Sequence, residues 1–383
     1  MANIEDYILW RGDLTVVQSP FNNVDNLILS NLVYLIFKDI VPELKNTKPT
    51  VLNKITGLFK QNNPSENQYI TIRDAVAKMN IQTEGRHRMH ISKDAEMAVK
   101  LADSKRFCNM KLMYYVDKYD EDIETQFAAI TVIMEDNTAY IAFRGTDTSL
   151  VGWREDFNMS FMEQVPAQKE ALKYLQTVSS LISIPLRIGG HSKGGNLAVY
   201  SALHIDKSVQ DRIIKVYNND GPGFKSSILE TKEYKAVQDK IDTIVPQTSI
   251  IGMLLEHEEE YIIIKSSETL IMQHDPYSWQ VMGPDFVKME STTTSSQLID
   301  TTLKQWINDM TIEQREQFID LIWEVMSAAK VKSFPEMAES LFANAVKMGK
   351  KINQLDDKSK DILSSALSML IKSAKNAIMK GFK

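Results

Sequence analysis

The sequence contains one cysteine among its 383 residues, so no disulfide can form within the chain. A chain without disulfides is typical of a reducing compartment. Long hydrophobic runs are also absent, because no stretch approaches the roughly 20 consecutive apolar residues that a membrane-spanning helix needs. The first residues are acidic where a secretory signal peptide needs a basic flank and an apolar run. Together these features predict a cytoplasmic protein.

Several function classes lack their usual sequence signatures. The net charge of −6 does not favour a nucleic-acid partner. Metal-ligand spacings, glycine-rich phosphate loops and internal repeats are all missing. The composition, 43% hydrophobic and 25% charged, is ordinary for a globular protein with a large core. We therefore expect a globular protein that needs no metal, cofactor or nucleic acid.

Hydrophobic patterning divides the chain into three parts. Residues 1–106 mix helical periodicity with polar connections, which predicts helices that pack beside a sheet. Residues 107–295 alternate strand-like and helix-like runs, which indicates a mostly parallel sheet with helices on its faces. Residues 296–383 have helical periodicity only, and they predict a separate helical subdomain.

Within the central part, the first two strand-like runs are joined by a short Asp-Asn turn and predict a β-hairpin. The expected strands are residues 127–136, 138–145, 185–190, 211–220, 242–246 and 260–267. The expected helices are residues 166–182, 194–205 and 226–240.

One short stretch has the pattern of a nucleophile elbow, G-x-S-x-G. It consists of Gly190, His191, Ser192, Lys193 and Gly194, and it lies between a strand-like run and a helix-like run. A serine on such a sharp turn is strained, and glycines two residues before and after it relieve the crowding. The turn also places the serine at a helix N-terminus, where N–H groups favour developing negative charge. The alternative is a glycine-rich turn with an incidental serine.

Two stretches resemble a known family. The sequence IAFRGT at 141–146, followed by GWREDF at 152–157, resembles the oxyanion-loop signature of the class 3, fungal-type lipases. GGHSKGGNLA at 189–198 resembles their nucleophile elbow, and the resemblance covers roughly Phe127 to Trp279. In detail, DGPGF at 220–224 and QHDPYSWQV at 273–281 are similar to a bacterial, Mbeg-like branch of lipase-like proteins.

The resemblance implies an α/β-hydrolase fold and a set of site residues. Ser192 corresponds to the nucleophile of the lipases. Thr146 offers its backbone N–H, and its hydroxyl, to the oxyanion, together with the backbone N–H of Lys193. Taken alone, the FRGT stretch would equally fit a tight turn with a surface arginine.

Six histidines are candidates for the catalytic base: His87, His90, His191, His204, His257 and His274. This fold orders its triad as serine, acid and histidine, which leaves the last two. His257 lies among carboxylates, and we expect it at the surface. His274 lies in a loop just after the last expected strand and is the predicted base. The alternative for His274 is a histidine that caps the following Asp-Pro turn.

The sequence leaves the acid of the triad open between two aspartates. In the lipases an aspartate immediately precedes the sequence IVP, but here Thr243 holds that place and Asp242 lies one position earlier. A one-residue slip reverses the face of a strand, which weakens the case for Asp242. Asp220 ends the strand that follows the nucleophile strand, where catalytic groups collect in open α/β sheets. We therefore favour Asp220 and keep Asp242 as the alternative.

These residues predict a serine hydrolase that cleaves carboxylic esters through an acyl-enzyme on Ser192. In this interpretation His274 takes the proton of the serine and later gives it to the leaving group. The alternative is a binding or scaffold protein that has kept the hydrolase fold and lost turnover. The displaced acid and the basic residue Lys193, where many lipases carry an apolar one, motivate that alternative.

The tail, residues 358–383, has the pattern of a basic amphipathic helix. It holds six lysines and one aspartate, and it has apolar residues at helical spacing, namely Leu363, Leu367, Leu370, Ala374 and Ile378. Such a helix can lie on an anionic membrane surface, in which case a lipid ester would be the natural substrate. The alternative is a helix that packs on the hydrolase body with its lysines in water.

Overall fold

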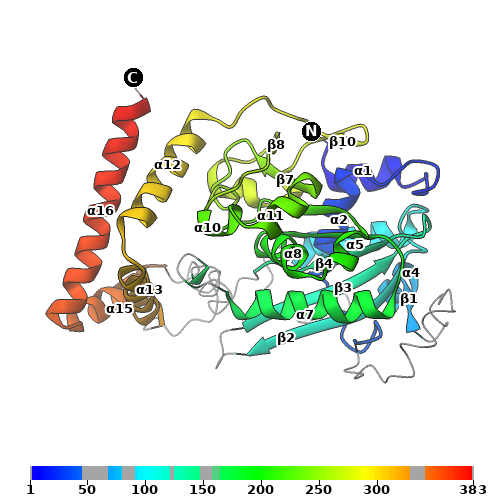
Figure 1. The fold of residues 1–383 in the computed structure, drawn as a ribbon, viewed down its shortest axis with the longest axis horizontal. Helices are drawn as coiled ribbons and strands as arrows, with labels where there is room; N and C mark the ends of the chain where they lie inside the picture. The colour runs from blue at the N-terminus through cyan, green and yellow to red at the C-terminus, as the bar shows by residue number, and fades with distance from the viewer. Residues whose placement is uncertain are drawn as a thin grey trace.

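Runs rich in β-branched and aromatic residues pair into one sheet. The computed structural model describes residues 2–44, 68–79, 91–120, 125–146, 158–159, 162, 164–327 and 341–381. In this part of the chain eight strands pair in sequence order, from β1 to β8 (Figure 1). The strands are β1 (Ile70–Thr71), β2 (Lys111–Asp120), β3 (Thr125–Ile133), β4 (Ala139–Phe143), β5 (Leu186–His191), β6 (Ile213–Asn219), β7 (Ile241–Pro246) and β8 (Tyr261–Ile264).

The sheet is antiparallel from β1 to β4 and parallel from β4 to β8. The crossovers that lead from β4 to β5, β5 to β6 and β6 to β7 carry helices, among them α7 (Pro166–Leu181), α8 (Lys193–His204), α10 (Ser226–Leu229) and α11 (Lys232–Val237). The predicted fold class, a mostly parallel sheet flanked by helices in the α/β-hydrolase manner, is therefore confirmed. Strands β1 and β2 are additions that the sequence patterns did not predict; β1 lies within residues 1–106, where only helices were expected.

Alternating side chains of the sheet enter two different cores, because successive residues of a strand point to opposite faces. In β4, Tyr140 and Ala142 pack with the N-terminal helices, whereas Ile141 and Phe143 pack with α7 and α8. The N-terminal helices are α1 (Ile4–Arg11), α2 (Asn23–Leu32), α4 (Ile72–Lys78) and α5 (Ile91–Asp103). Residues far apart in the sequence thus share the core on one face of the sheet.

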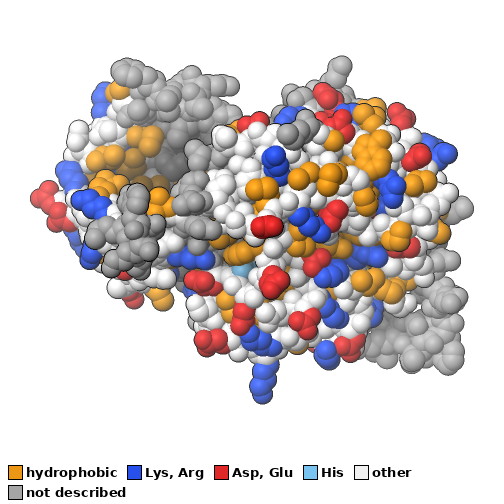
Figure 2. Space-filling view, turned by 90° about the horizontal axis from the view of Figure 1, so that it is seen from above, with side chains coloured by type: hydrophobic (Ala, Val, Ile, Leu, Met, Phe, Trp, Pro, Cys, Tyr) orange, Lys and Arg blue, Asp and Glu red, His pale blue; other side chains and the backbone are white. Residues whose placement is uncertain are grey.

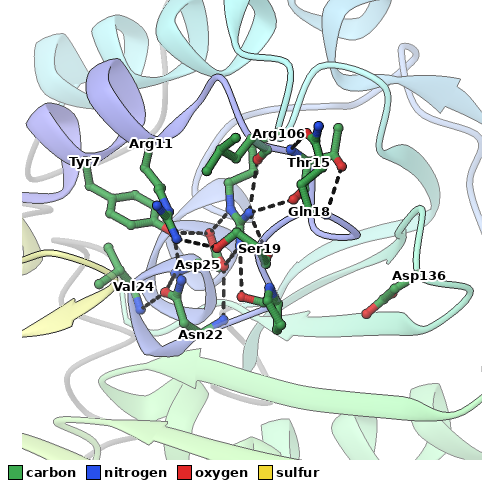
Figure 3. A network of polar contacts seen from close by, with 12 residues as sticks. Tyr7, Arg11, Thr15, Gln18, Ser19, Asn22, Val24, Asp25, Arg106 and Asp136 are labelled. Carbon is green, nitrogen blue, oxygen red and sulfur yellow. Dashed lines mark hydrogen bonds and ion pairs between the residues drawn. The ribbon is translucent and has the colours of Figure 1, made fainter.

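A buried ion pair joins α2 to the turn between α5 and β2 (Figure 3). The side chains of Arg106 and Asp25 are both fully buried, and Arg106 Nε donates to Asp25 Oδ1 at 2.6 Å. Arg106 Nη1 also donates to the carbonyl oxygen of Ser19 at 2.9 Å. Burial alone would lower the pKa of Arg106, but its hydrogen bond and charge interaction with Asp25 raise that pKa above its ordinary value.

The Arg106→Met variant leaves the Asp25 carboxylate buried without a cation. We expect the free energy of unfolding to fall by about 3–5 kcal/mol, as it does when one partner of a buried ion pair is removed. Urea denaturation at pH 7 measures this change. The control is Lys100→Met, which breaks the partly exposed pair with Glu5 and should cost about 1 kcal/mol or less. Equal losses in the two variants would contradict the expected effect.

The C-terminal helices form a cluster of their own beside the sheet-bearing part. They are α12 (Thr294–Asp309), α13 (Ile312–Ser327), α15 (Leu341–Gln354) and α16 (Asp357–Gly381). In Figure 1, α12 and α16 lie side by side, and Trp306 Nε1 donates to the carbonyl oxygen of Ala366 at 2.8 Å. Helix α16 therefore packs on its neighbours in this cluster through part of its surface.

Apolar side chains remain exposed on the C-terminal helices. On α16, Leu367 is 59% and Ile371 53% exposed. Figure 2 shows hydrophobic side chains gathered on the C-terminal part, whereas acidic and basic side chains intermingle over the rest of this face. Among the described residues, no helix is both long and apolar enough to cross a membrane. Membrane contact through residues 358–383 stays a prediction.

Candidate active site

Ser192 occupies a strained turn between β5 and α8. Its backbone has φ 60° and ψ −134°, a conformation that L-residues rarely adopt. Such a residue costs about 1–3 kcal/mol and persists only where its surroundings enforce it, typically at functional sites. Ser192 is 8% exposed and directly precedes the first residue of α8. The observed turn has the geometry that the G-x-S-x-G pattern predicted.

Glycines surround this turn because no side chain would fit beside it. A Cβ on Gly190 would lie 2.3 Å from the carbonyl carbon of Gly194, and a Cβ on Gly194 would lie 2.1 Å from the carbonyl oxygen of Phe143. A Cβ on Gly145 would lie 2.9 Å from Cβ of Ser192. The FRGT stretch therefore abuts the serine, and Thr146 is the next residue of that stretch. The GWREDF stretch lies outside the described residues.

His274 and Asp220 form a hydrogen-bonded pair. His274 is the last residue of the 3₁₀ helix η3 (Leu270–His274), and its Nδ1 lies 2.7 Å from Asp220 Oδ2. Asp220 follows β6 directly and has φ 51°, and its carboxylate is almost fully buried. With Nδ1–H donating to this carboxylate, the other ring nitrogen, Nε2, is left to exchange a proton. The structure thus brings together two residues that lie 54 positions apart.

The second oxygen of the Asp220 carboxylate also accepts hydrogen bonds. Asp220 Oδ1 accepts hydrogen bonds from Ser249 Oγ at 2.5 Å and from the backbone N–H of Gly252 at 3.2 Å. Hydrogen bonds to both oxygens fix the orientation of the carboxylate. Ser249 and Gly252 were not among the predicted site residues. Only the turn that follows β7 brings them to Asp220, and it matches no catalytic motif.

Asp242 lies elsewhere. It is the second residue of β7, opposite Tyr217 of β6, and its Oδ1 accepts a hydrogen bond from Lys215 Nζ at 2.5 Å. It is therefore set back from the carboxyl ends of the strands, where Asp220 and Ser192 lie. The structure joins Asp220 to His274 and joins Asp242 to Lys215, so Asp242 does not fill the place of a triad acid.

The elbow also holds the segment that carries His274. His191 Nε2 lies 2.9 Å from the backbone carbonyl oxygen of His274, and the centroids of the two rings are 4.5 Å apart. Trp279 packs edge-on to His191 and donates its indole N–H to the carbonyl oxygen of Gln273 at 2.9 Å. The residue before Ser192 is thus in direct contact with the histidine that binds Asp220.

Asn219, the last residue of β6, binds the elbow that follows β5. Its carbonyl oxygen accepts the N–H of Ser192 at 2.9 Å, and its side-chain Nδ2 donates to the carbonyl oxygen of Gly190 at 3.0 Å. From α2, Asn26 Nδ2 donates to Asn219 Oδ1 at 2.8 Å, and Ser30 Oγ lies 3.1 Å from Asn219 Nδ2. These side chains are all buried. Helix α2 therefore holds Asn219, and through it the elbow, by buried hydrogen bonds.

The remaining site predictions concern Lys193 and Thr146. The side chain of Lys193 is fully buried, and its Nζ donates to the carbonyl oxygen of Gln126 at 3.1 Å. Its ammonium group thus turns away from water into the protein, while its backbone N–H stands at the start of α8. Among the described residues, no hydrogen bond joins the hydroxyl of Ser192 to His274. In ligand-free structures such catalytic hydrogen bonds are often long.

The expectation of a surface position for His257 is wrong. Its side chain is 2% exposed, and its Nδ1 lies 3.1 Å from Oε1 of Glu259, a buried carboxylate that also accepts the hydroxyls of Thr243 and Tyr234. Burial alone would raise the pKa of Glu259, but these three groups lower it to about 2. The contact with this buried carboxylate explains why the side chain of His257 is buried.

The remaining candidate histidines are His204, His87 and His90. His204 ends α8, where its Nδ1 lies 2.9 Å from the carbonyl oxygen of Tyr200. His87 and His90 lie outside the described residues. Among the described residues, no cluster of three or more histidine, cysteine or acidic side chains has the arrangement of a metal site.

We predict that Glu259→Gln loses stability at neutral pH. The pKa of Glu259 in the folded protein is about 2, below the ordinary value of 4.5. Its ionised carboxylate therefore stabilises the folded protein by about 3 kcal/mol at pH values above the unfolded-state pKa. This contribution fades as the pH falls from about 4.5 to 2, so the difference in unfolding free energy from the wild type should shrink over that range. Urea denaturation at pH 7, 4 and 3 measures it. The control, Glu258→Gln, removes an exposed carboxylate and should change little; a difference from the wild type that is independent of pH would refute the assignment.

The region that carries the candidate site also matches a known protein family. The model of the Mbeg1-like family matches residues 101–324, which are more than half of the chain and include Ser192, Asp220 and His274. The chain belongs to the Mbeg1-like family. The resemblance to the Mbeg-like branch of lipase-like proteins is thereby confirmed.

Two lipases are among the solved structures that are similar to this Mbeg1-like chain. The M37 lipase is 20% identical with a TM-score of 0.33, and the match covers 45% of this chain and 64% of that one. The chain thus spans just under two thirds of the M37 lipase. The Rhizomucor miehei lipase in its propeptide complex is 16% identical with a TM-score of 0.34, covering 50% of this chain and 71% of that one. No curated protein matches the chain.

Proposed function

We propose that this protein is a serine hydrolase that cleaves carboxylic esters through an acyl-enzyme on Ser192. The observation that carries the proposal is the 2.7 Å hydrogen bond between Asp220 and His274, placed where the ring of His274 contacts the elbow of Ser192. A histidine oriented by a buried carboxylate beside an elbow serine is the arrangement that activates a serine for acyl transfer.

In the first half of the reaction, Ser192 Oγ attacks the ester carbonyl carbon while Nε2 of His274 takes the hydroxyl proton. The ester C–O bond then breaks, and the same proton passes to the departing alcohol. In the second half, His274 deprotonates a water molecule that attacks the acyl-enzyme, and Ser192 regains its proton as the acid leaves. Asp220 holds the imidazole through Nδ1 and stabilises its charged form.

The negative charge that develops on the carbonyl oxygen needs hydrogen-bond donors. The backbone N–H of Lys193 stands at the N-terminus of α8, where the helix dipole also favours an anion. Gly145 lies against Ser192, and the backbone N–H of the next residue, Thr146, is the second proposed donor. Each such donor contributes about 2.7–4 kcal/mol to the stabilisation of the transition state. No step of this mechanism uses a metal or a cofactor.

We expect a fluorophosphonate probe to label the wild-type protein, because such probes react with serines whose hydroxyl is activated by a base. Labelling should disappear in Ser192→Ala and persist in Ser208→Ala, which changes an exposed serine on α9 (Lys207–Gln210). Gel fluorescence or intact mass measures the labelled fraction. Wild-type protein that is folded by circular dichroism and takes up no probe would exclude an activated serine.

The two aspartates give a second, sharper prediction. Asp220→Asn should lower kcat for 4-nitrophenyl butyrate by about 10⁴-fold, because the imidazole loses the partner that fixes its tautomer. His274→Ala should abolish turnover, whereas Asp242→Asn should keep the wild-type rate because Asp242 binds Lys215 on the neighbouring strand. Stopped-flow or steady-state absorbance at 400 nm records the release of nitrophenolate. Full activity in Asp220→Asn would remove that residue from the mechanism.

A second candidate function is a binding or scaffold role without turnover. It is favoured by the small exposure of Ser192 and by the missing hydrogen bond between its hydroxyl and His274 among the described residues. In that case the strained turn would persist as inherited architecture, and the probe would leave the folded protein unlabelled.

A further inference from the structure

A cavity of about 420 Å³ opens on the same edge of the sheet as the elbow. One wall is the face of α7 that carries Glu170, Lys173, Tyr174 and Thr177, residues spaced three or four apart along the helix. The opposite walls come from the end of β2 and from the segment that follows α2. The volume is within the range of about 300–1,000 Å³ that is usual for small-molecule sites.

The cavity and the elbow share walls. Tyr34 lines the cavity, and its hydroxyl lies 3.5 Å from the carbonyl oxygen of His191, the residue before Ser192. Arg144 also lines the cavity, and its backbone packs against Gly194 so closely that a Cβ there would lie 3.0 Å from the Arg144 carbonyl carbon. The cavity therefore adjoins the elbow through Tyr34 and Arg144.

The interior of the cavity is aromatic. Tyr34, Tyr115, Phe127 and Tyr174 line it together with aliphatic side chains. Phe127 and Tyr174 pack against each other with ring centroids 6.3 Å apart, and Tyr115 and Phe127 are fully or nearly fully buried. Such walls favour an apolar or aromatic group over a strongly hydrated one.

The rim of the cavity carries unpaired positive charge. Among its basic side chains, Arg144 pairs with Asp117 at 2.9 Å and Lys118 pairs with Glu170 at 2.5 Å. Lys38 and Lys173 are exposed and have no ion-pair partner in the described part of the chain. Among the acidic lining residues, Glu43 alone is likewise exposed and without an ion-pair partner in the described part of the chain. The cavity thus has a net positive rim on a chain whose net charge is −6.

We infer that this cavity holds the part of the ester that does not react, and that this part carries an anionic group beyond an apolar or aromatic segment. The inference rests on the proposed ester hydrolysis at Ser192 and names its substrate class. The apolar segment packs on the aromatic walls, and the anion lies near Lys38 and Lys173. Opposite charge at the rim raises both the encounter rate and the affinity, and salt weakens the effect.

Two pairs of esters test this inference, one for each side of the ester bond. On the acyl side, mono-4-nitrophenyl glutarate is compared with 4-nitrophenyl pentanoate; on the alcohol side, 4-acetoxybenzoate is compared with phenyl acetate. In at least one pair the anionic ester should have the higher kcat/KM. The Lys38→Gln, Lys173→Gln double variant should reduce that advantage about tenfold through KM, with the neutral ester unaffected.

The control is the Lys169→Gln, Lys232→Gln double variant, which removes the same charge from exposed positions on α7 and α11 outside the cavity. It should retain the preference for the anionic ester. An advantage that survives in the Lys38, Lys173 variant, or a preference for the neutral ester in both pairs, would overturn the inference.

Binding separates this inference from the proposed function. In Ser192→Ala protein, calorimetry with the same intact esters should show tighter binding of the anionic member, weakened about tenfold by the two lysine substitutions. Equal binding of anionic and neutral esters would overturn the inference even if the wild type hydrolyses both. Wild-type protein that shows this binding and yet takes up no fluorophosphonate would overturn the hydrolase proposal alone.

Discussion

The left-handed backbone of Ser192 is the constraint to which the surrounding structure is fitted. A non-glycine residue at φ 60° is unfavourable by itself, so neighbouring groups must hold it there. The N–H of Ser192 is fixed by the carbonyl oxygen of Asn219, and its own carbonyl oxygen accepts the N–H of Gly195. Gly190 and Gly194 are present because the turn leaves no room for a Cβ. These contacts present the serine at the start of α8.

The residues that would act with the serine are held by the same strand pair. Strand β6 ends at Asn219, which binds the elbow, and the next residue is Asp220, which binds His274. His191, the last residue of β5, contacts the backbone carbonyl oxygen of His274. Ser192, His274 and Asp220 are thus connected through His191 and Asn219, the last residues of β5 and β6. The hydrogen bonds of Ser249 and Gly252 hold the second oxygen of the Asp220 carboxylate.

Sequence patterns predicted those features of the fold that depend on residues close together in the sequence. The elbow, the β3–β4 hairpin and the alternation of strands and helices could be predicted because glycine spacing and hydrophobic period are read over a few residues. Strand β2 escaped prediction because a bulge at Tyr114, with φ 58°, interrupts its alternation and its last residues are charged. The choice between Asp220 and Asp242, and the burial of His257 against Glu259, depend on contacts between distant segments that no local pattern encodes.

The polar contacts between α2 and the sheet bear on where the chain could be divided. A polypeptide that began at residue 107 would retain every residue of the candidate triad and lose Asn26 and Ser30, the partners of the Asn219 amide. It would also expose to water the face of the sheet that carries Tyr140 and Tyr217, and leave Arg106 and its network behind. The part of the chain that carries the candidate triad thus shares its core and its polar contacts with the N-terminal helices.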